Sequence, residues 1–487
     1  MTTGRAAIKQ PAAQPTGGLL PIRNSGPLLD HGLRDLRRLA LDTVAAGIRA
    51  ANPAAAVDRL VHVQGSALAA DGHHFDLTRV RSILILGAGK ASAPIAAAME
   101  AKLGNRLAGG LVVSRREASG PVEEGLRRVE IVEADHPVPS LASLAAGRRL
   151  MLAAAAARPA DLVITAFTGG SSALACLPPD GVSFAAKQRL HQMLLDSGAS
   201  IAEINAVRKH VSALKGGRLA AAMNGATLLN LTLSDVPDDS ADLLCDPVVQ
   251  DTTDTSAAVA VLKRYHLWQD AGTEVRRHLS SALADSPVLD GRASITTVLL
   301  VSGRDVAAAM AARVRTLGWE PVVLGSTFEG EAEQTGGLLG AFARESSQHG
   351  HPFRPGSVLI GAGGESTVRL HRTGTRSAGT GGPNQELALS FARAIARGPA
   401  AVAGVFLDSD GSDGGTDAAG GCVDSTTAPA AAAGGVDLDE AVLGHDSRAA
   451  LRQLGDLVIT GPTGTNVSDL WAIAIGAGPP PGPRGPL

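Results

Sequence analysis

Short apolar runs that lead directly into glycine-rich loops recur in this chain, and they constrain its fold more than any other feature. The three loops are 87–92, 168–172 and 461–466, and they follow the apolar runs 83–86, 162–165 and 457–460. Each pattern predicts a buried parallel strand that ends in a loop with exposed backbone N–H groups. Because α/β proteins bind anions at such strand ends, the three loops together favour an enzyme that handles phosphate groups.

The composition limits the partners that this chain can bind. Its 487 residues carry a formal net charge of −3, and only 2% of them are aromatic. A nearly neutral chain with few aromatic side chains lacks the basic surface and the stacking platform that nucleic acid requires, so we expect no nucleic acid partner. No uncharged apolar run is long enough to cross a bilayer, which predicts no membrane partner either.

The cysteines indicate a reducing compartment. Cys176, Cys245 and Cys422 lie far apart in the sequence and show neither a C-x-x-C spacing nor a disulfide framework. We interpret them as small buried thiols rather than as metal ligands. A cytoplasmic protein follows from this interpretation.

Strand and helix patterns alternate along most of the chain, which predicts an α/β fold with mainly parallel sheets covered by helices. A second strand–helix series begins near residue 296, and helical sequence between 255 and 295 joins it to the first. We therefore predict an N-terminal domain at 29–270 and a C-terminal domain at 271–477. Residues 1–28 lack an apolar signal core and are expected to be a flexible extension. The Pro- and Gly-rich residues 478–487 are expected to be a disordered tail.

The first glycine loop places a lysine at the start of a predicted helix. The segment Gly87-Ala88-Gly89-Lys90-Ala91-Ser92 is not a Walker A motif, and it lacks the third glycine of a dinucleotide fingerprint. The helix dipole disfavours a lysine at a helix N-terminus unless an anion is bound there. We therefore predict that Lys90 is a phosphate ligand.

A helix predicted over residues 201–214 carries a polar stripe beside its apolar stripe. The polar stripe contains Asn205, Arg208, Ser212 and Lys215, and the helix then meets Gly216-Gly217. Such a stripe is also typical of a solvated helix face. A Gly-Gly break before a new helix, however, offers free N–H groups to an anion.

The second half of the chain supplies carboxylates at predicted strand ends. Glu365 follows a strand within a Gly-rich segment, and an acidic loop extends over residues 408–417. This loop lacks the glutamate that an EF-hand requires at its twelfth position, so carboxylates that face phosphates and Mg²⁺ fit it better. The polar cluster at 384–386 opens a predicted helix, and it could serve as a simple cap or as a substrate contact.

These motifs together resemble one family, the glycerate kinases that form 2-phosphoglycerate, some of which are labelled hydroxypyruvate reductases. The similarity extends from about residue 35 to residue 475, and its segments are 87–91, 136–139, 204–210, 215–220, 234–237, 384–389 and 460–467. The resemblance implies a larger Rossmann-like N-terminal domain and a smaller MOFRL-like C-terminal domain, with the active site in the cleft between them. It also implies ATP and Mg²⁺ as cofactors and D-glycerate as the small-molecule substrate.

With this resemblance, roles can be assigned to individual residues. Lys90 is expected to stabilise the transferred phosphoryl group, the Lys215-Gly216-Gly217 turn to bind phosphate or carboxylate, and Asp235 to be the general base or a metal ligand. The predicted metal ligands are Glu365, Asp410 and Asp413. The other predicted phosphate- and substrate-binding residues are Gly87, Gly89, Gly169, Gly170, Ser171, Asn205, Arg208, Asn384, Glu386, Thr463, Thr465 and Asn466.

The chain also departs from the family pattern. Pro383 stands where the family usually has an arginine, and Asp408 stands where it usually has a glycine. Arg372 or Arg376 could supply the missing charge. Two alternatives to the kinase remain: a relative acting on another small hydroxy acid, and an NAD(P)H-dependent reductase of hydroxypyruvate. A homo-oligomer is possible.

Overall fold

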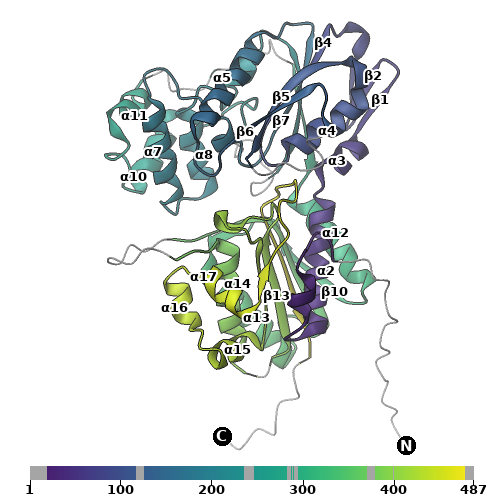
Figure 1. The fold of residues 1–487 in the computed structure, drawn as a ribbon, viewed down its shortest axis with the longest axis vertical. Helices are drawn as coiled ribbons and strands as arrows, with labels where there is room; N and C mark the ends of the chain where they lie inside the picture. The colour runs from purple at the N-terminus through teal and green to yellow at the C-terminus, as the bar shows by residue number, and fades with distance from the viewer. Residues whose placement is uncertain are drawn as a thin grey trace, which may run out of the picture.

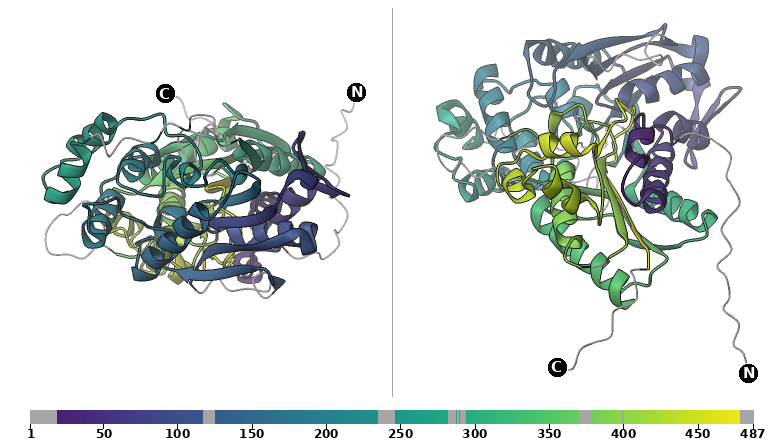
Figure 2. Two further views of the ribbon diagram at one scale, coloured as in Figure 1. Left: turned by 90° about the horizontal axis from the view of Figure 1, so that it is seen from above. Right: turned by 60° about the horizontal axis from the view of Figure 1, so that its bottom comes forward.

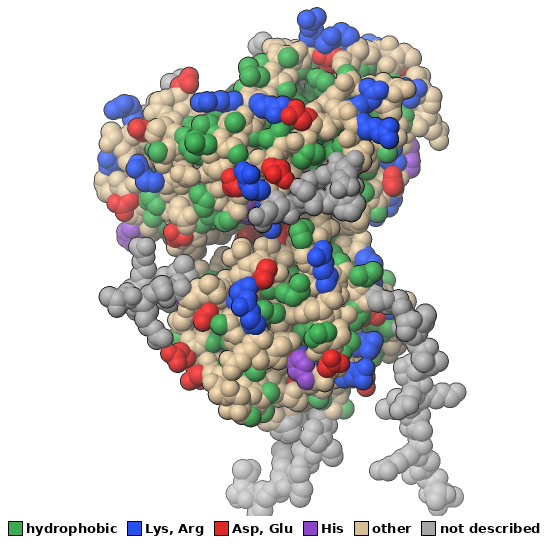
Figure 3. Space-filling view, viewed as in Figure 1, with side chains coloured by type: hydrophobic (Ala, Val, Ile, Leu, Met, Phe, Trp, Pro, Cys, Tyr) green, Lys and Arg blue, Asp and Glu red, His purple; other side chains and the backbone are tan. Residues whose placement is uncertain are grey.

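The computed structural model describes residues 19–116, 125–234, 246–281, 287, 289, 294–369, 379–398 and 400–477. Two α/β domains, each built on its own large β-sheet, lie one above the other (Figure 1). Figure 3 shows them as two lobes with a waist between them, and charged side chains of both signs are spread over this face. The predicted α/β class is therefore confirmed.

The large sheet of the N-terminal domain is parallel throughout, with the strand order β6-β5-β4-β7-β8-β9. Its strands are β4 (Ser82–Ala88), β5 (Leu107–Arg115), β6 (Val129–Ala134), β7 (Asp161–Phe167), β8 (Thr227–Leu233) and β9 (Ile295–Val301). Strand β7 is buried along its whole length, as expected for a central parallel strand covered on both faces. Because β4 and β7 are neighbours in register, the first two glycine loops meet at one edge of the sheet.

Helices cover both faces of this sheet. Alternate residues of β4 belong to two different apolar clusters, one with α4 (Ser92–Leu103) and the other with α5 (Leu141–Ala155). A separate helical layer has its own core and consists of α7 (Phe184–Leu195), α8 (Ile201–His210), α10 (Thr255–Arg264) and α11 (Gly272–Leu279). The short helices α6 (Ser171–Leu174) and α9 (Arg218–Ala221) follow the second glycine loop and the Gly-Gly break.

The second large sheet is mixed, which differs from the mainly parallel sheet that we expected. Its order is β10-β12-β16-β13-β14-β15, and only β10 and the short β11 pair with β12 in parallel. Its strands are β10 (Glu320–Gly325), β11 (Glu329–Glu331), β12 (Ser357–Thr367), β13 (Val402–Asp408), β14 (Gly420–Asp424), β15 (Leu457–Val458) and β16 (Asp469–Ile475). Strand β16 is the last in the chain but enters the middle of the sheet between β12 and β13, antiparallel to both.

The same finding corrects the prediction of a parallel strand before the third glycine loop. Strand β15 has only two residues and pairs antiparallel with β14, so the loop 461–466 does not follow a buried parallel strand. Four apolar residues in a row are too short a signal to separate a central parallel strand from a short edge strand. The parallel strands predicted before the first two loops are confirmed, because β4 and β7 are parallel and central.

Helices pack on both faces of the second sheet, as the right-hand view of Figure 2 shows. One face holds α2 (Arg34–Ala50) and α12 (Gly303–Thr316), and the other holds α13 (Ala332–His349) and α14 (Pro383–Ile395). Because successive side chains of a strand point to opposite faces, those of β13 and β16 are divided between these two cores. Three short helices complete the second face: α15 (Thr427–Ala433), α16 (Leu438–Leu443) and α17 (Ser447–Leu454).

Three elements do not follow the domain division expected at residues 270 and 271. One of them, α11, begins at residue 272 but shares the helical core of α7, α8 and α10. Helix α2 precedes the N-terminal domain in sequence but packs against β13 and β16 of the C-terminal sheet, and Arg37 forms buried ion pairs with Asp424 and Asp456 there. Strand β9 lies beyond residue 270 but completes the N-terminal sheet. The chain therefore crosses between the domains more than once. After the first crossing, which follows α2, the chain forms helix α3 (Pro53–Leu60) and then a small antiparallel sheet of β1 (Val61–Gln64), β2 (Ala67–Ala70) and β3 (His73–Asp76).

Residues 19–28, which we expected to belong to a flexible extension over 1–28, are part of the fold. Helix α1 (Ser25–Leu29) buries its last two leucines, and Asn24 exchanges hydrogen bonds with the Leu457 carbonyl and the Ile459 N–H. These contacts hold residues 19–28 against the C-terminal domain. The rest of the expected extension and the tail predicted at 478–487 lie outside the described residues.

Candidate functional site

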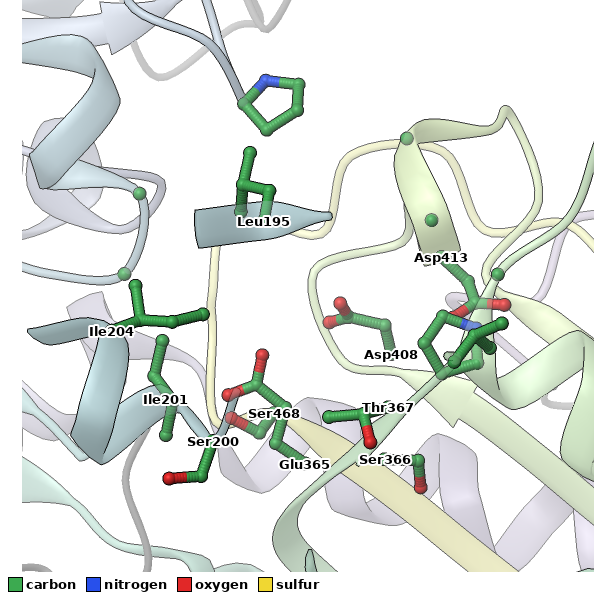
Figure 4. Close-up of a pocket in the computed structure, with 18 of the residues that line it drawn as sticks. Leu195, Ser200, Ile201, Ile204, Glu365, Ser366, Thr367, Asp408, Asp413 and Ser468 are labelled. Carbon is green, nitrogen blue, oxygen red and sulfur yellow. The ribbon is translucent and has the colours of Figure 1, made fainter. Parts of the chain in front are cut away.

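A cavity of about 1060 Å³ lies between the two domains. One wall consists of Lys90, the loop after β7, and helices α7 and α8 of the N-terminal domain. The other wall consists of the end of β12, the first turn of α14 and the loop after β13. Figure 4 shows Ile201 and Ile204 on one side of this space and Thr367 and Asp408 on the other.

An ion pair between Lys90 and Asp410 connects the two domains. Lys90 lies just before α4, and its Nζ forms an ion pair with Oδ2 of Asp410, which lies in the loop after β13. The Lys90 side chain is 17% exposed and the Asp410 side chain 4%. The structure thus brings together a predicted catalytic residue and a predicted metal ligand from opposite domains.

The backbone of the first glycine loop does not present free N–H groups to the cavity. The N–H of Gly89 donates to the Val113 carbonyl, that of Lys90 to the Gly169 carbonyl, and that of Ala91 to the Thr168 hydroxyl. A Cβ atom at Gly89, whose φ is +139°, would collide with Thr168. Gly87 and Gly89 do not line the cavity; they permit close packing of the β4 loop against the β7 loop.

The second glycine loop does line the cavity. Gly169, Gly170 and Ser171 are all on its wall, and the Ser171 hydroxyl accepts a hydrogen bond of 2.7 Å from Lys215 Nζ. Lys215 itself is 2% exposed and is not part of the lining. We therefore interpret Lys215 as a residue that positions Ser171 and places a positive charge behind it.

The Gly-Gly break after Lys215 is a packing position. The N–H of Gly216 donates to the Asp246 carbonyl, and Gly217, with φ of +80°, would bring a Cβ against Leu289 and Val249. Neither glycine lines the cavity. The turn predicted to bind an anion therefore packs against the segment that begins at residue 246.

The polar stripe of α8 faces the cavity through Asn205 and Arg208. Arg208 donates to the Asn205 amide oxygen at 3.5 Å and lies 3.2 Å from Nε2 of His191 on α7. These contacts hold the guanidinium at the wall, where it can bind a carboxylate or phosphate. Helix α8 ends at His210, earlier than residue 214, the end that we predicted.

His136 and His191 add two imidazoles to this wall. Burial lowers the pKa of both well below the usual range, and the nearby charges of Lys90 and Arg115 on His136, and of Arg208 and Lys187 on His191, lower it further. Both rings are therefore neutral at neutral pH. A bound anion would favour their protonated forms, because it would offset the surrounding positive charge.

The carboxylate of Asp413 caps helix α14. It accepts hydrogen bonds from the backbone N–H groups of Asn384 and Gln385 at 3.1 and 2.9 Å, and from the Gln385 side-chain amide at 3.0 Å. Burial raises the pKa of Asp413 to about 7, against the opposite effect of these donors. Its oxygens are thus occupied by the start of the helix, which is where an anion is most stable.

Asn384 links Asp413 to a further carboxylate, Asp469. The Asn384 amide donates to Asp469 Oδ1 at 2.6 Å, and the N–H of Ser366 donates to Asp469 Oδ2 at 2.8 Å. Burial raises the pKa of Asp469 to about 6. The predicted residue Asn384 therefore orients the carboxylates of the C-terminal wall and also lines the cavity.

Asp408 and Glu365 also line this wall, and Figure 4 shows the Asp408 carboxylate pointing into the cavity. One Asp408 oxygen accepts the N–H of Asp410 at 2.9 Å. Burial and the neighbouring charge of Asp410 raise the pKa of Asp408 well above its usual range. A cation at this position would stabilise the ionised form.

Glu386, predicted to contact substrate, also lies within hydrogen-bond distance of a histidine. His445 Nδ1 lies 2.9 Å from Glu386 Oε2, and both side chains line the cavity. Burial raises the pKa of Glu386, although the contact with His445 opposes this effect.

The loop after β15 contributes one of its three predicted residues to the lining, Asn466. The Thr463 hydroxyl donates to the Ser409 carbonyl at 2.6 Å, and the Thr465 hydroxyl to the Ala51 carbonyl at the end of α2, also at 2.6 Å. Both threonines hold the loop in place rather than face the cavity.

The described part of the chain contains no group of three or more His, Cys, Asp or Glu side chains that could hold a metal ion by itself. The trio Glu365, Asp410 and Asp413 therefore forms no complete metal cage among these residues. Asp235, the predicted general base, lies outside the described residues, as do Arg372 and Arg376. Pro383 is the first residue of α14 and lines the cavity without charge.

Acidic side chains dominate the cavity wall among the residues that the structure describes. The permanent cations on the wall are Lys90, Arg208 and Arg369. The acidic residues on it are Asp196, Glu203, Asp246, Glu329, Glu331, Glu365, Glu386, Asp408, Asp413 and Asp469.

Sequence reasoning missed the roles of His191, His445 and Asp469. His191 sits in an ordinary helical pattern, and His445 lies between two short helices, so neither has a local signal. Asp469 directly precedes the apolar run of β16, which resembles a simple strand start. Only the arrangement of distant segments brings these side chains to the cavity.

The comparisons with known proteins agree with this architecture. A domain of unknown function, DUF4147, matches residues 39–280, and the MOFRL family matches residues 358–469. A glycerate 2-kinase of Pyrococcus horikoshii is 35% identical over 91% of this chain and 97% of its own length. A protein of Agrobacterium vitis with a provisional hydroxypyruvate reductase name is 38% identical over 81% of this chain and 87% of its own length. The crystal structure of a glycerate kinase from Thermotoga maritima matches with a TM-score of 0.71 and 32% identity, covering 91% of this chain and 99% of that one.

The fold and the site define a two-domain α/β enzyme whose candidate active site lies in the cleft between the domains. The chain belongs to the glycerate kinase family, the family that its sequence motifs indicated. No helix in the described residues is long and apolar enough to cross a membrane.

Proposed function

We propose that this chain is a glycerate 2-kinase that transfers the γ-phosphoryl group of ATP to the 2-hydroxyl of D-glycerate. The observation that carries the proposal is the ion pair between Lys90, which lines the cavity, and Asp410 of the opposite domain. Phosphoryl transfer needs positioning and charge neutralisation more than covalent help from the protein. Family membership supports the same activity.

In the proposed reaction, the bond between the γ-phosphorus and the β,γ-bridging oxygen breaks, a bond to the glycerate O2 forms, and ADP leaves. Lys90 neutralises charge that develops on the transferred group. Arg208, held by Asn205, and the loop Gly169-Gly170-Ser171 bind the glycerate carboxylate. Asp235 is our prediction for the group that accepts the hydroxyl proton.

Mg²⁺ fits the donor chemistry of the wall that follows β13. Magnesium is usually held by one or two carboxylates together with substrate phosphates, so a complete protein cage is not required. Asp408 and Asp410 are the carboxylates that we propose for this role, because burial and the neighbouring charge of Asp410 raise the pKa of Asp408, and a cation beside them would offset both effects. Asp413 is occupied as a helix cap. When bound, the metal would neutralise phosphate charge.

The first glycine loop favours the kinase over the reductase. A dinucleotide site needs backbone N–H groups directed at the pyrophosphate, and in this chain those of Gly89, Lys90 and Ala91 donate to other parts of the protein. Pro383 still motivates the second alternative, an enzyme for another small hydroxy acid, because it leaves the first turn of α14 without the cation that the family pattern implies there.

The decisive experiment measures ADP release from ATP, Mg²⁺ and D-glycerate, with phosphorus NMR to identify the product. Glycerate-dependent formation of 2-phosphoglycerate would support the proposal and show that Pro383 is tolerated. Folded, ATP-binding protein without glycerate turnover would contradict it, and a panel of other hydroxy acids would then test the second alternative. Oxidation of NADH with hydroxypyruvate would instead indicate the reductase.

We also propose that the enzyme is cytoplasmic and that it acts on a small molecule without nucleic acid or membrane partners. A homo-oligomer stays a prediction, which light scattering of the purified protein would test.

A further inference from the structure

A smaller cavity of about 270 Å³ adjoins the main one. Its charged and titratable lining residues are Lys90, Arg115, Arg116, Asp135, His136 and Asp410, and we call it the basic arm. Lys90 and His136 belong to both linings, so the basic arm opens from the main cavity at the proposed reaction centre.

Arg115 is the cation of the basic arm that has no counter-ion among the described residues. It is the last residue of β5 and is half-buried, and its side chain forms no hydrogen bond or ion pair with the residues that the structure describes. The other two cations differ, since Arg116 pairs with Asp135 at 3.1 Å and Lys90 pairs with Asp410. A half-buried guanidinium that lacks a counter-ion favours binding of an anion.

The environment of His136 supports an excess of positive charge here. Besides burial, the charges of Lys90, Arg115 and Arg208 lower its pKa. Cations from three separate elements therefore act on one imidazole at the mouth of the basic arm. No comparable excess occurs in the main cavity, where acidic side chains outnumber Lys90, Arg208 and Arg369 among the described residues.

We propose that the basic arm binds the polyphosphate of the nucleotide, with Arg115 as its principal ligand, while the hydroxy acid occupies the main cavity beside Arg208 and Ser171. This inference rests on the proposed kinase function and adds the direction from which the phosphate donor approaches. The two substrates then meet at Lys90 from opposite sides.

The difference in charge between the two substrates favours this placement of the nucleotide and the hydroxy acid. A nucleotide triphosphate carries several negative charges, and the acidic main cavity repels them, whereas the basic arm attracts them. A hydroxy acid carries a single carboxylate, for which one guanidinium is a sufficient partner. The reverse arrangement would place the most highly charged ligand among the carboxylates and leave Arg115 without a counter-ion.

Binding of tripolyphosphate, which has neither base nor sugar, tests the proposal without catalysis. In metal-free buffer, calorimetry should show binding to the wild type and at least about tenfold weaker binding to the R115A variant, because charge-assisted hydrogen bonds contribute this much or more. The R38A variant is the matched control, since Arg38 is exposed on α2 and lies on neither cavity lining. It should bind tripolyphosphate as the wild type does.

Kinetics give a second readout. Tripolyphosphate should compete with ATP and not with D-glycerate in the wild type, a result that does not depend on any variant folding. R115A should raise KM for ATP about tenfold or more and leave KM for D-glycerate within about threefold. Equal tripolyphosphate affinity in R115A and wild type, or competition with glycerate, would overturn the proposal.

These outcomes separate the two proposals. Loss of tripolyphosphate binding in R115A without any glycerate turnover in the wild type would support the basic arm and refute the glycerate assignment. Turnover of glycerate with unchanged tripolyphosphate binding in R115A would do the opposite.

Discussion

Replacing Lys90 with methionine tests the centre of the proposed site. The substitution keeps the length of the side chain and removes its charge. The expected loss of kcat can be worked out from the surroundings of the amine. The Lys90 side chain is 17% exposed and pairs with an Asp410 side chain that is 4% exposed, so the site is neither fully solvated nor dry. At an effective dielectric constant of about 20, two unit charges about 4 Å apart interact with about 4 kcal/mol.

An energy of this size in the transition state corresponds to about a thousandfold in rate, since about 1.4 kcal/mol is a factor of ten. We therefore expect K90M to lower kcat about a thousandfold. Coupled measurement of ADP release under saturating ATP and D-glycerate would give the value, and circular dichroism would establish that the variant is folded.

Lys102, in the last turn of the helix α4 that follows Lys90, supplies a matched control. Its Nζ lies 2.9 Å from Asp58 Oδ1 and its side chain is 20% exposed, close to the exposure of Lys90. The K102M variant should retain kcat within about twofold, because exposed ion pairs contribute little and this one is remote from the cavity. If folded K90M kept kcat within tenfold of the wild type, the assignment of Lys90 to the transferred phosphoryl group would be refuted.

Three further predictions concern stability and pH. R37M should lower the free energy of unfolding by about 3–5 kcal/mol in urea titrations, because it leaves the buried Asp424 and Asp456 without their cation; a loss below about 1 kcal/mol would contradict this reading. D413N should cost about 1–3 kcal/mol, since a side-chain amide would replace a carboxylate oxygen facing the N–H donors at the start of α14; unchanged stability would show that the cap is not needed. Folding raises the pKa of His31 above 6.5, chiefly through its hydrogen bond to Asp456. Its stabilisation is therefore complete below that pH and is lost as the pH rises through the folded-state pKa, so H31Q should differ more from wild type at about pH 5.5 than at about pH 8, and a larger difference at high pH would refute the sign.

The sequence predicted the centre of the N-terminal domain well. Strands β4 and β7 appear in it as mainly apolar runs followed by glycine-rich loops, a local pattern that needs no knowledge of distant residues. The polar stripe of α8 could also be derived from helical spacing, and it does bring Asn205 and Arg208 to the cavity.

The roles of the glycines and carboxylates could not be predicted in the same way. Gly87 and Gly89 lie in a loop that resembles an anion site, yet its N–H groups are taken by Val113, Gly169 and Thr168 from other segments. Asp410 and Asp413 belong to one acidic loop and have the same residue type. One nevertheless pairs with Lys90 and the other caps α14, because their neighbours differ.

The sequence by itself determined the α/β class, the central strands β4 and β7, and the family. Apolar periodicity and short motifs are properties of contiguous residues, so they can be recognised without the fold. The tertiary structure alone decided that α2 packs on the C-terminal sheet, that β16 inserts antiparallel between β12 and β13, and that Arg115 and Arg116 meet Lys90 in the basic arm. These features depend on contacts between segments that are not adjacent in the sequence. Burial and electrostatic fields act through space rather than along the chain, so only the folded arrangement determines which carboxylate is paired, which is a cap, and which faces the substrate.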